Sequence, residues 1–204
     1  MLIAVSDLAE AAREIAARYG LASIEGGRHP DWGTANRIVP LGETYLELIA
    51  VVDEAKAAES TVGRWVAGAR PELARPLGWA VRTHALDAVA RRLGLTARAG
   101  SRAAPGGELL RWRSVGIEEA AAEPSLPFFI EWGQRTPFPG RAGATHPVGP
   151  VEIASLVLDG DAGRLAAWLG DHELPITVRP GTPAVVNIVL SGGAGEIVLA
   201  AGLS

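Results

Sequence analysis

Three glycines at nearly constant spacing are the sequence feature that most constrains the fold. Gly20, Gly94 and Gly170 each follow a short segment whose apolar residues recur every three or four positions, the pattern of an amphipathic helix that ends at a glycine. One short apolar run precedes each helix and three follow it, so the order strand, helix, strand, strand, strand occurs three times. The sequence therefore predicts three degenerate copies of a βαβββ module, although this period is too long for the usual solenoids.

The first copy shows the local signals most clearly. Asp7 is expected to cap its helix, with Glu10 three residues later as in a capping box. If residues 42 and 43 form a two-residue turn, Ile38 pairs with Glu47, and Asn36 lies on the same sheet face as Glu47. The four strands of this copy are expected at Leu2–Val5, Leu21–Glu25, Thr34–Leu41 and Thr44–Val52.

The same signals divide the rest of the chain. We expect an α+β protein in which tandem βαβββ modules form curved mixed sheets around a pocket, with the helices outside. The segments are a first module at 1–53, a helical connector at 54–76, a second module at 77–133, a loop at 134–150 and a third module at 151–204. Later strands are expected at Leu77–Thr83, Thr96–Arg102, Leu109–Val115, Pro127–Trp132, Val151–Leu158, Ile176–Arg179, Ala184–Leu190 and Glu196–Ala201. The third module is also a candidate homodimer interface.

Composition excludes several classes of function. With 48% hydrophobic and 21% charged residues, the chain is expected to fold. A net charge of −4 and scattered arginines argue against a nucleic-acid partner. No apolar run approaches the roughly 20 residues that cross a membrane, and the run before Asp7 is too short for a signal peptide. The absence of cysteine excludes disulfides and thiolate chemistry and fits a reducing compartment, so a cytoplasmic location is expected.

Polar residues are densest between Gly26 and Val52, a stretch that contains GGRHPDWGTANRIVPLGETYLELIAV. This stretch, with PFFIEW at Pro127–Trp132 and His146-Pro147 as secondary matches, resembles the vicinal oxygen chelate (glyoxalase/bleomycin resistance/dioxygenase) superfamily and, more narrowly, its glyoxalase-like domain group. The resemblance implies paired modules around a cavity, and in the superfamily's enzymes a divalent metal there. Four ligands, typically His or Glu, would come from the first and last strands of each module. Such a metal stabilises an enediolate or a similar anion, whereas other members only bind a drug.

Glu47 and Glu131 are the leading candidates for catalysis and for metal ligation. Each is a charge inside an apolar strand, where it needs a partner, a metal or water. Strand alternation would place Tyr45 and Phe129 on the same side as these carboxylates. The alternative is that one or both pair with an arginine such as Arg37 or Arg111.

The other candidates surround these two carboxylates. His29 follows two glycines that allow a ligand to approach the backbone, so it is a candidate catalytic group, with a loop hydrogen bond as the alternative. The predicted substrate-binding residues are Asn36, Thr34, Tyr45, Trp32, Phe129 and His146.

The first-strand ligands are where the sequence departs from the family pattern. Alignment puts one just before Met1 and the other near Pro76–Gly78, where no side chain can ligate. Either another histidine substitutes, or the protein binds its ligand without metal, or the native chain starts upstream. The leading hypothesis is a glyoxalase-like protein that acts on a small oxygenated organic molecule as a lyase, isomerase or dioxygenase, with a divalent metal as the candidate cofactor. The competing hypothesis is a non-catalytic protein that binds a small molecule or sequesters a drug.

Overall fold

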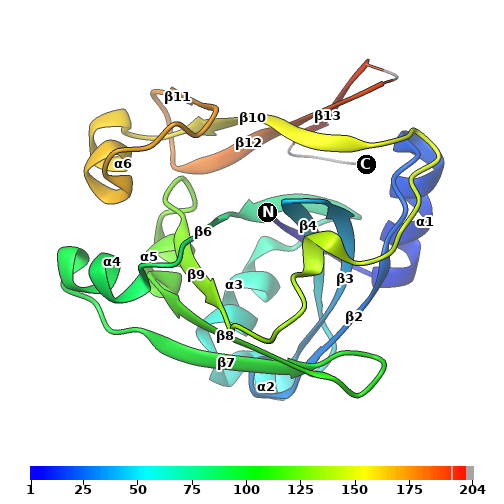
Figure 1. The fold of residues 1–204 in the computed structure, drawn as a ribbon, viewed down its shortest axis with the longest axis horizontal. Helices are drawn as coiled ribbons and strands as arrows, with labels where there is room; N and C mark the ends of the chain where they lie inside the picture. The colour runs from blue at the N-terminus through cyan, green and yellow to red at the C-terminus, as the bar shows by residue number, and fades with distance from the viewer. Residues whose placement is uncertain (194, 201–204) are drawn as a thin grey trace.

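A strongly curved sheet organises the molecule. The computed structural model describes residues 1–193 and 195–200. Within them, a nine-stranded mixed sheet with the order β5-β1-β4-β3-β2-β7-β8-β9-β6 bends around a central space, and a four-stranded sheet with the order β11-β10-β12-β13 lies along one side of it, at the top of Figure 1. The predicted α+β fold of curved mixed sheets is confirmed.

The first module forms because its local signals agree with one another. The Asp7 side chain accepts a hydrogen bond from the Glu10 backbone N–H at 2.7 Å, and Gly20 ends the helix in the left-handed conformation. A strand and a short 3-10 turn then lead into the hairpin. The elements are β1 (Leu2–Val5), α1 (Leu8–Tyr19), β2 (Ile24–His29), η1 (Pro30–Trp32), β3 (Thr34–Leu41) and β4 (Thr44–Val51).

The hairpin between β3 and β4 has the predicted register. Gly42 has a φ of 78°, which a side chain would strain, whereas Glu43 does not have a positive φ. This combination fits the type II′ turn rather than type I′, which needs positive φ at both positions. Ile38 pairs with Glu47, so Asn36 and Glu47 lie on the same face, as predicted.

The second module repeats the strand order of the first. Across the sheet, the strands of the first module lie in the order β1-β4-β3-β2 and those of the second in the order β6-β9-β8-β7. The two modules join where Arg28 of β2 pairs with Ala103 of β7. This edge-to-edge pairing turns two small sheets into one curved sheet. The elements are β6 (Ala80–Arg82), α4 (Leu86–Leu93), β7 (Arg98–Ala103), β8 (Leu109–Val115), α5 (Ile117–Ala122) and β9 (Phe128–Trp132).

The connector between the modules differs from the prediction at its end. It holds two helices, α2 (Glu54–Glu59) and α3 (Thr61–Ala69), and then strand β5 (Ala74–Gly78), which runs antiparallel to β1. The single strand predicted at 77–83 is therefore two strands, β5 and β6, that pair with different partners. The strand is interrupted between them at Trp79, whose buried indole N–H donates to the Ser125 carbonyl at 3.1 Å.

The third module repeats the order of elements but not the pairing of strands. Its first strand lies between its second and third strands, whereas β1 and β6 each pair with the last strand of their module. Its helix also ends differently, because Gly170 has a ψ of −162° where Gly20 and Gly94 are left-handed. The elements are β10 (Val151–Asp159), α6 (Ala162–Leu169), β11 (Ile176–Arg179), β12 (Ala184–Gly192) and β13 (Gly195–Ala200). The last residue of the predicted strand 196–201 lies outside the described residues.

The two faces of the nine-stranded sheet bury different partners. On one face, residues such as Ile3, Leu46 and Leu48 form a core with α1, α4 and the third module. On the other face, Leu2 and Ile49 pack with α3 and α5, so these two helices fill the inside of the curve rather than lying outside it. None of the helices in the described part of the chain is both long and apolar enough to cross a bilayer.

Candidate functional site

An aromatic cavity lies on the inner face of the curved sheet. It has a volume of about 50 Å³ and is enclosed by strands of both modules together with α3 and α5. Four of the chain's six tryptophans line it: Trp32, Trp65, Trp112 and Trp132. Trp32 was predicted to lie here. The tertiary packing of the connector, β8 and β9 brings the other rings in.

Glu47 and Asn36 form the polar centre of the cavity. Asn36, buried on β3, donates from Nδ2 to Oε1 of Glu47 on β4 at 2.6 Å. Among the described residues, the second carboxylate oxygen of Glu47 has no hydrogen-bond partner. The predicted neighbourhood of Asn36 and Glu47 is therefore observed, and it leaves one carboxylate oxygen available to a ligand.

Gly26 allows Asn36 to take this position. A methyl group at residue 26 would overlap the Asn36 side-chain oxygen and come within 3.0 Å of its backbone carbonyl oxygen. That side-chain oxygen is itself buried without a hydrogen-bond partner. Gly26 thus supports the Asn36–Glu47 pair by allowing β2 to approach β3 closely.

His29 is a buried, neutral imidazole beside this pair. It is 4% exposed, its Nδ1 lies 3.1 Å from Thr34 Oγ1, and its ring centroid is 4.9 Å from that of Trp32. Burial lowers the pKa of His29 to about 4; the Glu47 carboxylate opposes this shift and the Arg102 guanidinium adds to it. His29 lines the cavity, whereas Thr34 does not line it and only contacts His29.

Neutral His29 makes the stability of the protein depend on pH. Between the pKa of about 4 in the folded state and the ordinary 6.5 of the unfolded chain, the unfolded state binds more protons, so stability falls as the pH is lowered. The shift corresponds to about 3 kcal/mol between pH 7 and pH 4. Urea unfolding of wild type and His29→Gln at pH 7, 6 and 5 measures it, and the variant is expected to show a shallower loss than wild type. His84→Gln, at an exposed histidine, is the matched control; an equal pH slope in all three proteins would contradict the assignment.

Arg102 is a site residue that the sequence did not reveal. It lies on β7, is 5% exposed, and donates from a guanidinium nitrogen to the Gly26 carbonyl across the junction of the modules. Burial lowers its pKa and the Glu47 carboxylate opposes that shift, so the two charges compensate each other inside the protein. An arginine in an alternating strand is a weak signal, and only the pairing of β2 with β7 brings it to the cavity.

Tyr45 faces the cavity as predicted. Burial, reinforced by the nearby Glu47 carboxylate, holds the pKa of the Tyr45 phenol above its ordinary value. The hydroxyl is therefore protonated at neutral pH and can donate a hydrogen bond. Its ring centroid lies 6.5 Å from that of Trp132 and 5.7 Å from that of Phe138.

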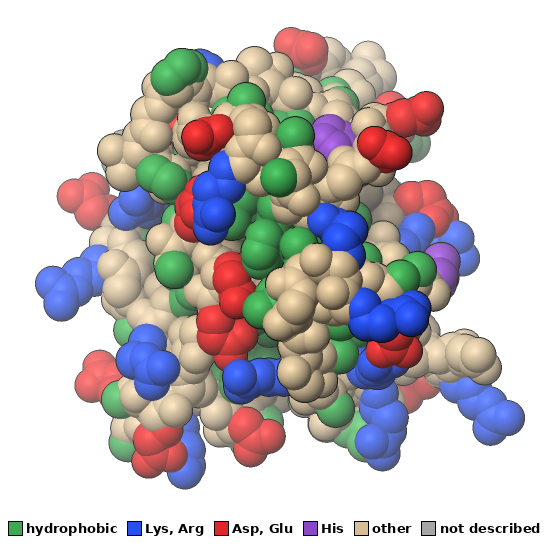
Figure 2. Space-filling view, turned by 90° about the vertical axis from the view of Figure 1, so that its left-hand side faces the viewer, with side chains coloured by type: hydrophobic (Ala, Val, Ile, Leu, Met, Phe, Trp, Pro, Cys, Tyr) green, Lys and Arg blue, Asp and Glu red, His purple; other side chains and the backbone are tan. Residues whose placement is uncertain are grey.

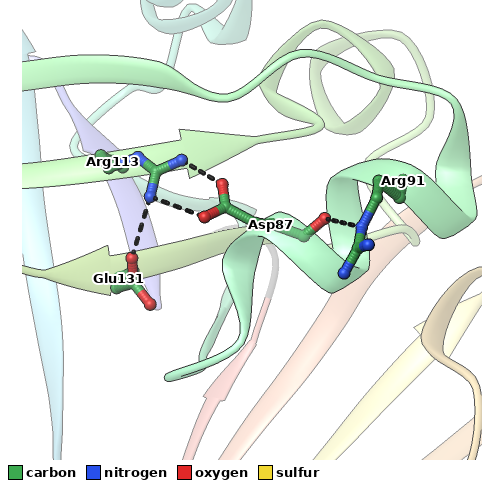
Figure 3. Close-up of polar contacts among 4 residues, drawn as sticks. All are labelled: Asp87, Arg91, Arg113 and Glu131. Carbon is green, nitrogen blue, oxygen red and sulfur yellow. Dashed lines mark hydrogen bonds and ion pairs between the residues drawn. The ribbon is translucent and has the colours of Figure 1, made fainter.

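Glu131 and Phe129 are not in the cavity, contrary to the prediction. The residues of β9 that line it are Phe128, Ile130 and Trp132, so Glu131 and Phe129 point to the other face of the strand. Glu131 instead lies 3.4 Å from Arg113, which also pairs with Asp87 (Figure 3). When YLELI and FFIEW are aligned on their glutamates, the alignment differs by one residue from the equivalence of the two strands in the fold. A shift of one residue moves a side chain to the opposite face of the sheet.

His146 is also away from the cavity. Its Nδ1 accepts a hydrogen bond from the Ala22 backbone N–H at 3.0 Å, and its Nε2 lies 2.7 Å from the Pro40 carbonyl oxygen. The ring therefore fastens the loop at 134–150 to the first module. Both ring nitrogens already have partners, and the predicted part of His146 in substrate binding stays a prediction.

The side chains of the cavity do not fit the metal site that the family pattern implies. Leu2, not a ligand, stands beside Glu47 in the pairing of β1 with β4. The predicted partner ligand Glu131 lies on the far face of β9. In residues 1–193 and 195–200, no group of three or more His, Cys, Asp or Glu side chains is arranged to hold a metal ion. The donor set at the centre is one carboxylate, one amide and one histidine.

A second, larger chamber adjoins the first. It has a volume of about 310 Å³, lies between the curved sheet and the third module, and shares Leu2, Tyr45, Phe128, Ile130 and Trp132 with the small cavity. Figure 2 shows hydrophobic side chains gathered in a hollow at the middle of the molecule's left-hand face, beneath the part that the third module forms. The indole N–H of Trp132, in the shared wall, is buried without an acceptor.

Comparisons with known proteins agree with this architecture. A family model described as a glyoxalase-like domain matches residues 1–173. A hypothetical protein from Staphylococcus aureus is similar in structure, with a TM-score of 0.60 and 12% identity over 87% of this chain and 89% of that one. Methylmalonyl-CoA epimerase from Mycobacterium tuberculosis matches with a TM-score of 0.42 and 21% identity over 64% of this chain and 83% of that one. At 12% identity, the similarity to the Staphylococcus aureus protein shows the fold alone. A comparison with curated protein sequences found no match.

Proposed function

The chain belongs to the glyoxalase-like domain family, and from this premise we propose that it acts on a small carbonyl compound by moving a proton next to the carbonyl group. The observation that carries the proposal is the Asn36–Glu47 hydrogen bond inside an aromatic cavity beside buried Arg102. Asn36 holds one oxygen of the carboxylate and orients the other. A carboxylate held in this way is suited to act as a general base.

The proposed step uses only side chains of this site. Glu47 takes a proton from the carbon beside the carbonyl; the electron pair of the C–H bond forms a carbon–carbon double bond, and the π pair of the carbonyl moves to its oxygen to form an enolate. Tyr45, whose hydroxyl is protonated, and Arg102 line the same cavity as Glu47, so they can stabilise that oxyanion. Return of a proton from Glu47 to this carbon regenerates the ketone with its hydrogen exchanged. Delivery of a proton from water on the opposite face, with release of the first proton from Glu47 to solvent, completes an epimerisation.

Deuterium exchange tests this proposal. The protein is incubated in D₂O with neutral ketones such as 2-butanone, cyclohexanone and 4-phenyl-2-butanone, and hydrogen loss beside the carbonyl is followed by NMR. Exchange that exceeds the buffer rate and saturates with ketone concentration is the expected result. If ketones quench tryptophan fluorescence on binding but none exchanges, the proposal is wrong.

The second candidate is binding without catalysis. It is favoured by the four tryptophans around the cavity and by Leu2 beside Glu47, because an aromatic wall with few polar groups is sufficient to hold an apolar ligand. The same experiment separates the two functions, since a binding protein quenches its fluorescence with ligand and leaves the deuterium content of the ligand unchanged.

Gly26→Ala is expected to slow exchange without touching the ligand. The added methyl group overlaps the Asn36 side chain, so Asn36 must turn and release Glu47. A displacement of the base by about 1 Å lowers a rate by up to roughly a hundredfold. The exchange rate and the urea midpoint are measured together, with Gly68→Ala as the control because its added methyl group meets no atom within 4 Å. Unchanged exchange in Gly26→Ala would show that Asn36 does not position the base.

A further inference from the structure

The small cavity has much less room for a ligand than the chamber beside it. Its volume is about 50 Å³. The outer chamber has a volume of about 310 Å³ and shares a wall with it. A ligand whose reacting carbon reaches Glu47 must therefore keep most of its atoms in the outer chamber.

The lining of the outer chamber is apolar and comes from distant parts of the chain. Trp79 and Phe138 contribute from the region of the second module and the loop that follows it, while Leu156, Leu174 and Ile176 contribute from the third module. Burial of a ligand's apolar surface against these side chains favours binding by about 25 cal/mol per Å². The third module thus supplies one wall of the chamber.

The charged side chains of the outer chamber belong to one network. Its lining includes Glu43 and Arg82, which form an ion pair at 2.9 Å. The Arg82 guanidinium also lies 4.3 Å from the centre of the Phe138 ring, and Arg141 pairs with Glu43 at 2.5 Å. Arg82 and Arg141 share the single Glu43 carboxylate, so this network carries a net positive charge, and the Met1 amino group in the lining donates to a backbone carbonyl at 3.0 Å. No other described residue of the lining is charged, so the body of the ligand meets uncharged walls that offer no partner to a phosphate or carboxylate.

We propose, building on the proposed function, that the ligand is a neutral carbonyl compound with an apolar body larger than its carbonyl end. Its carbonyl end enters the small cavity towards Glu47, and its body lies in the outer chamber against the third module. A carbonyl oxygen at the shared wall meets the two donors there, the Tyr45 hydroxyl and the otherwise unpaired Trp132 N–H. Leu174 and Ile176 are the residues that select the body of the ligand.

A series of methyl ketones tests the size and charge of the ligand. Affinities of 2-butanone, 2-hexanone and 2-octanone are measured from the quenching of tryptophan fluorescence, and each added methylene is expected to tighten binding roughly fourfold. The anion 7-oxooctanoate, which matches 2-octanone in chain length, is expected to bind at least tenfold more weakly. Affinity that is independent of chain length, or tighter binding of the anion, would overturn the proposal.

Leu174→Glu tests the wall that the third module supplies. Leu174 is 39% exposed, so a charge there is tolerated by the fold but meets the ligand body. The variant is expected to weaken 2-octanone binding at least tenfold and to leave the affinity for 2-butanone within twofold. Leu109→Glu, at a leucine that is 44% exposed and lines neither chamber, is the matched control and is expected to bind both ketones as wild type does. Equal 2-octanone affinity in Leu174→Glu and wild type would overturn the assignment.

The two proposals fail in different ways. If affinity rises with chain length and falls in Leu174→Glu, but no ketone exchanges deuterium, the chamber assignment stands and the proposed catalysis is wrong. If ketones exchange deuterium, but neither the exchange rate nor the affinity depends on the length of the ketone's carbon chain, the proposed catalysis stands and the chamber assignment is wrong.

Discussion

Glu47→Gln is expected to lower ketone deuterium exchange by a factor of about 10² to 10⁴, the range that general base catalysis contributes. Glutamine keeps the size of the side chain and can still accept the Asn36 hydrogen bond through its carbonyl oxygen. Its amide nitrogen, which replaces the second carboxylate oxygen, cannot take up a proton from the ketone. The rate is followed by NMR in D₂O, and ligand affinity by tryptophan fluorescence, so that loss of chemistry is separated from loss of binding.

Glu131→Gln is the matched control for this experiment. Glu131 is the corresponding carboxylate in the sequence of the second module, but it lies on the far face of β9 and pairs with Arg113 (Figure 3). The variant is expected to exchange ketones at the wild-type rate and, because its ion pair is partly exposed, to lose at most about 1 kcal/mol of stability. Comparable losses of exchange in both variants would mean that neither carboxylate acts as the base in the way proposed.

Trp79→Ala is expected to destabilise the folded state by about 3 to 5 kcal/mol, the largest effect on stability foreseen here. Trp79 is 2% exposed and lies where β5 ends and β6 begins, within the core that the third module shares. Its removal leaves a cavity and leaves the buried Ser125 carbonyl without its hydrogen-bond donor. Urea unfolding at pH 7, followed by circular dichroism, measures the change.

Trp79→Phe separates the ring from the hydrogen bond. It keeps most of the apolar volume and is expected to lose about 1 to 3 kcal/mol, because the Ser125 carbonyl still loses its donor. Leu109→Ala, at an exposed leucine, is expected to change stability by less than about 0.5 kcal/mol. If Trp79→Ala loses no more than Leu109→Ala does, Trp79 does not hold the break between β5 and β6 in place.

The site could be predicted where its geometry is local. Gly42 selects the turn, the turn sets the register, and the register brings Asn36 beside Glu47. His29, Trp32 and Tyr45 belong to the same continuous stretch and were also found from it. In the second module the same reasoning failed for Glu131 and Phe129, because an offset of one residue in β9 reverses the face and no local signal marks that offset.

By itself the sequence determined the order of the strands within each module, the hairpin register and the position of Glu47 and Asn36, because helix caps, turn glycines and strand alternation act over a few residues; it did not predict helix α5 between β8 and β9. Tertiary structure alone decided the rest of the site. Arg102 reaches Glu47 only through the pairing of β2 with β7, and the outer chamber exists only because the third module packs against the curved sheet. These contacts join residues far apart in the chain, and their free energy comes from burial that no local pattern encodes.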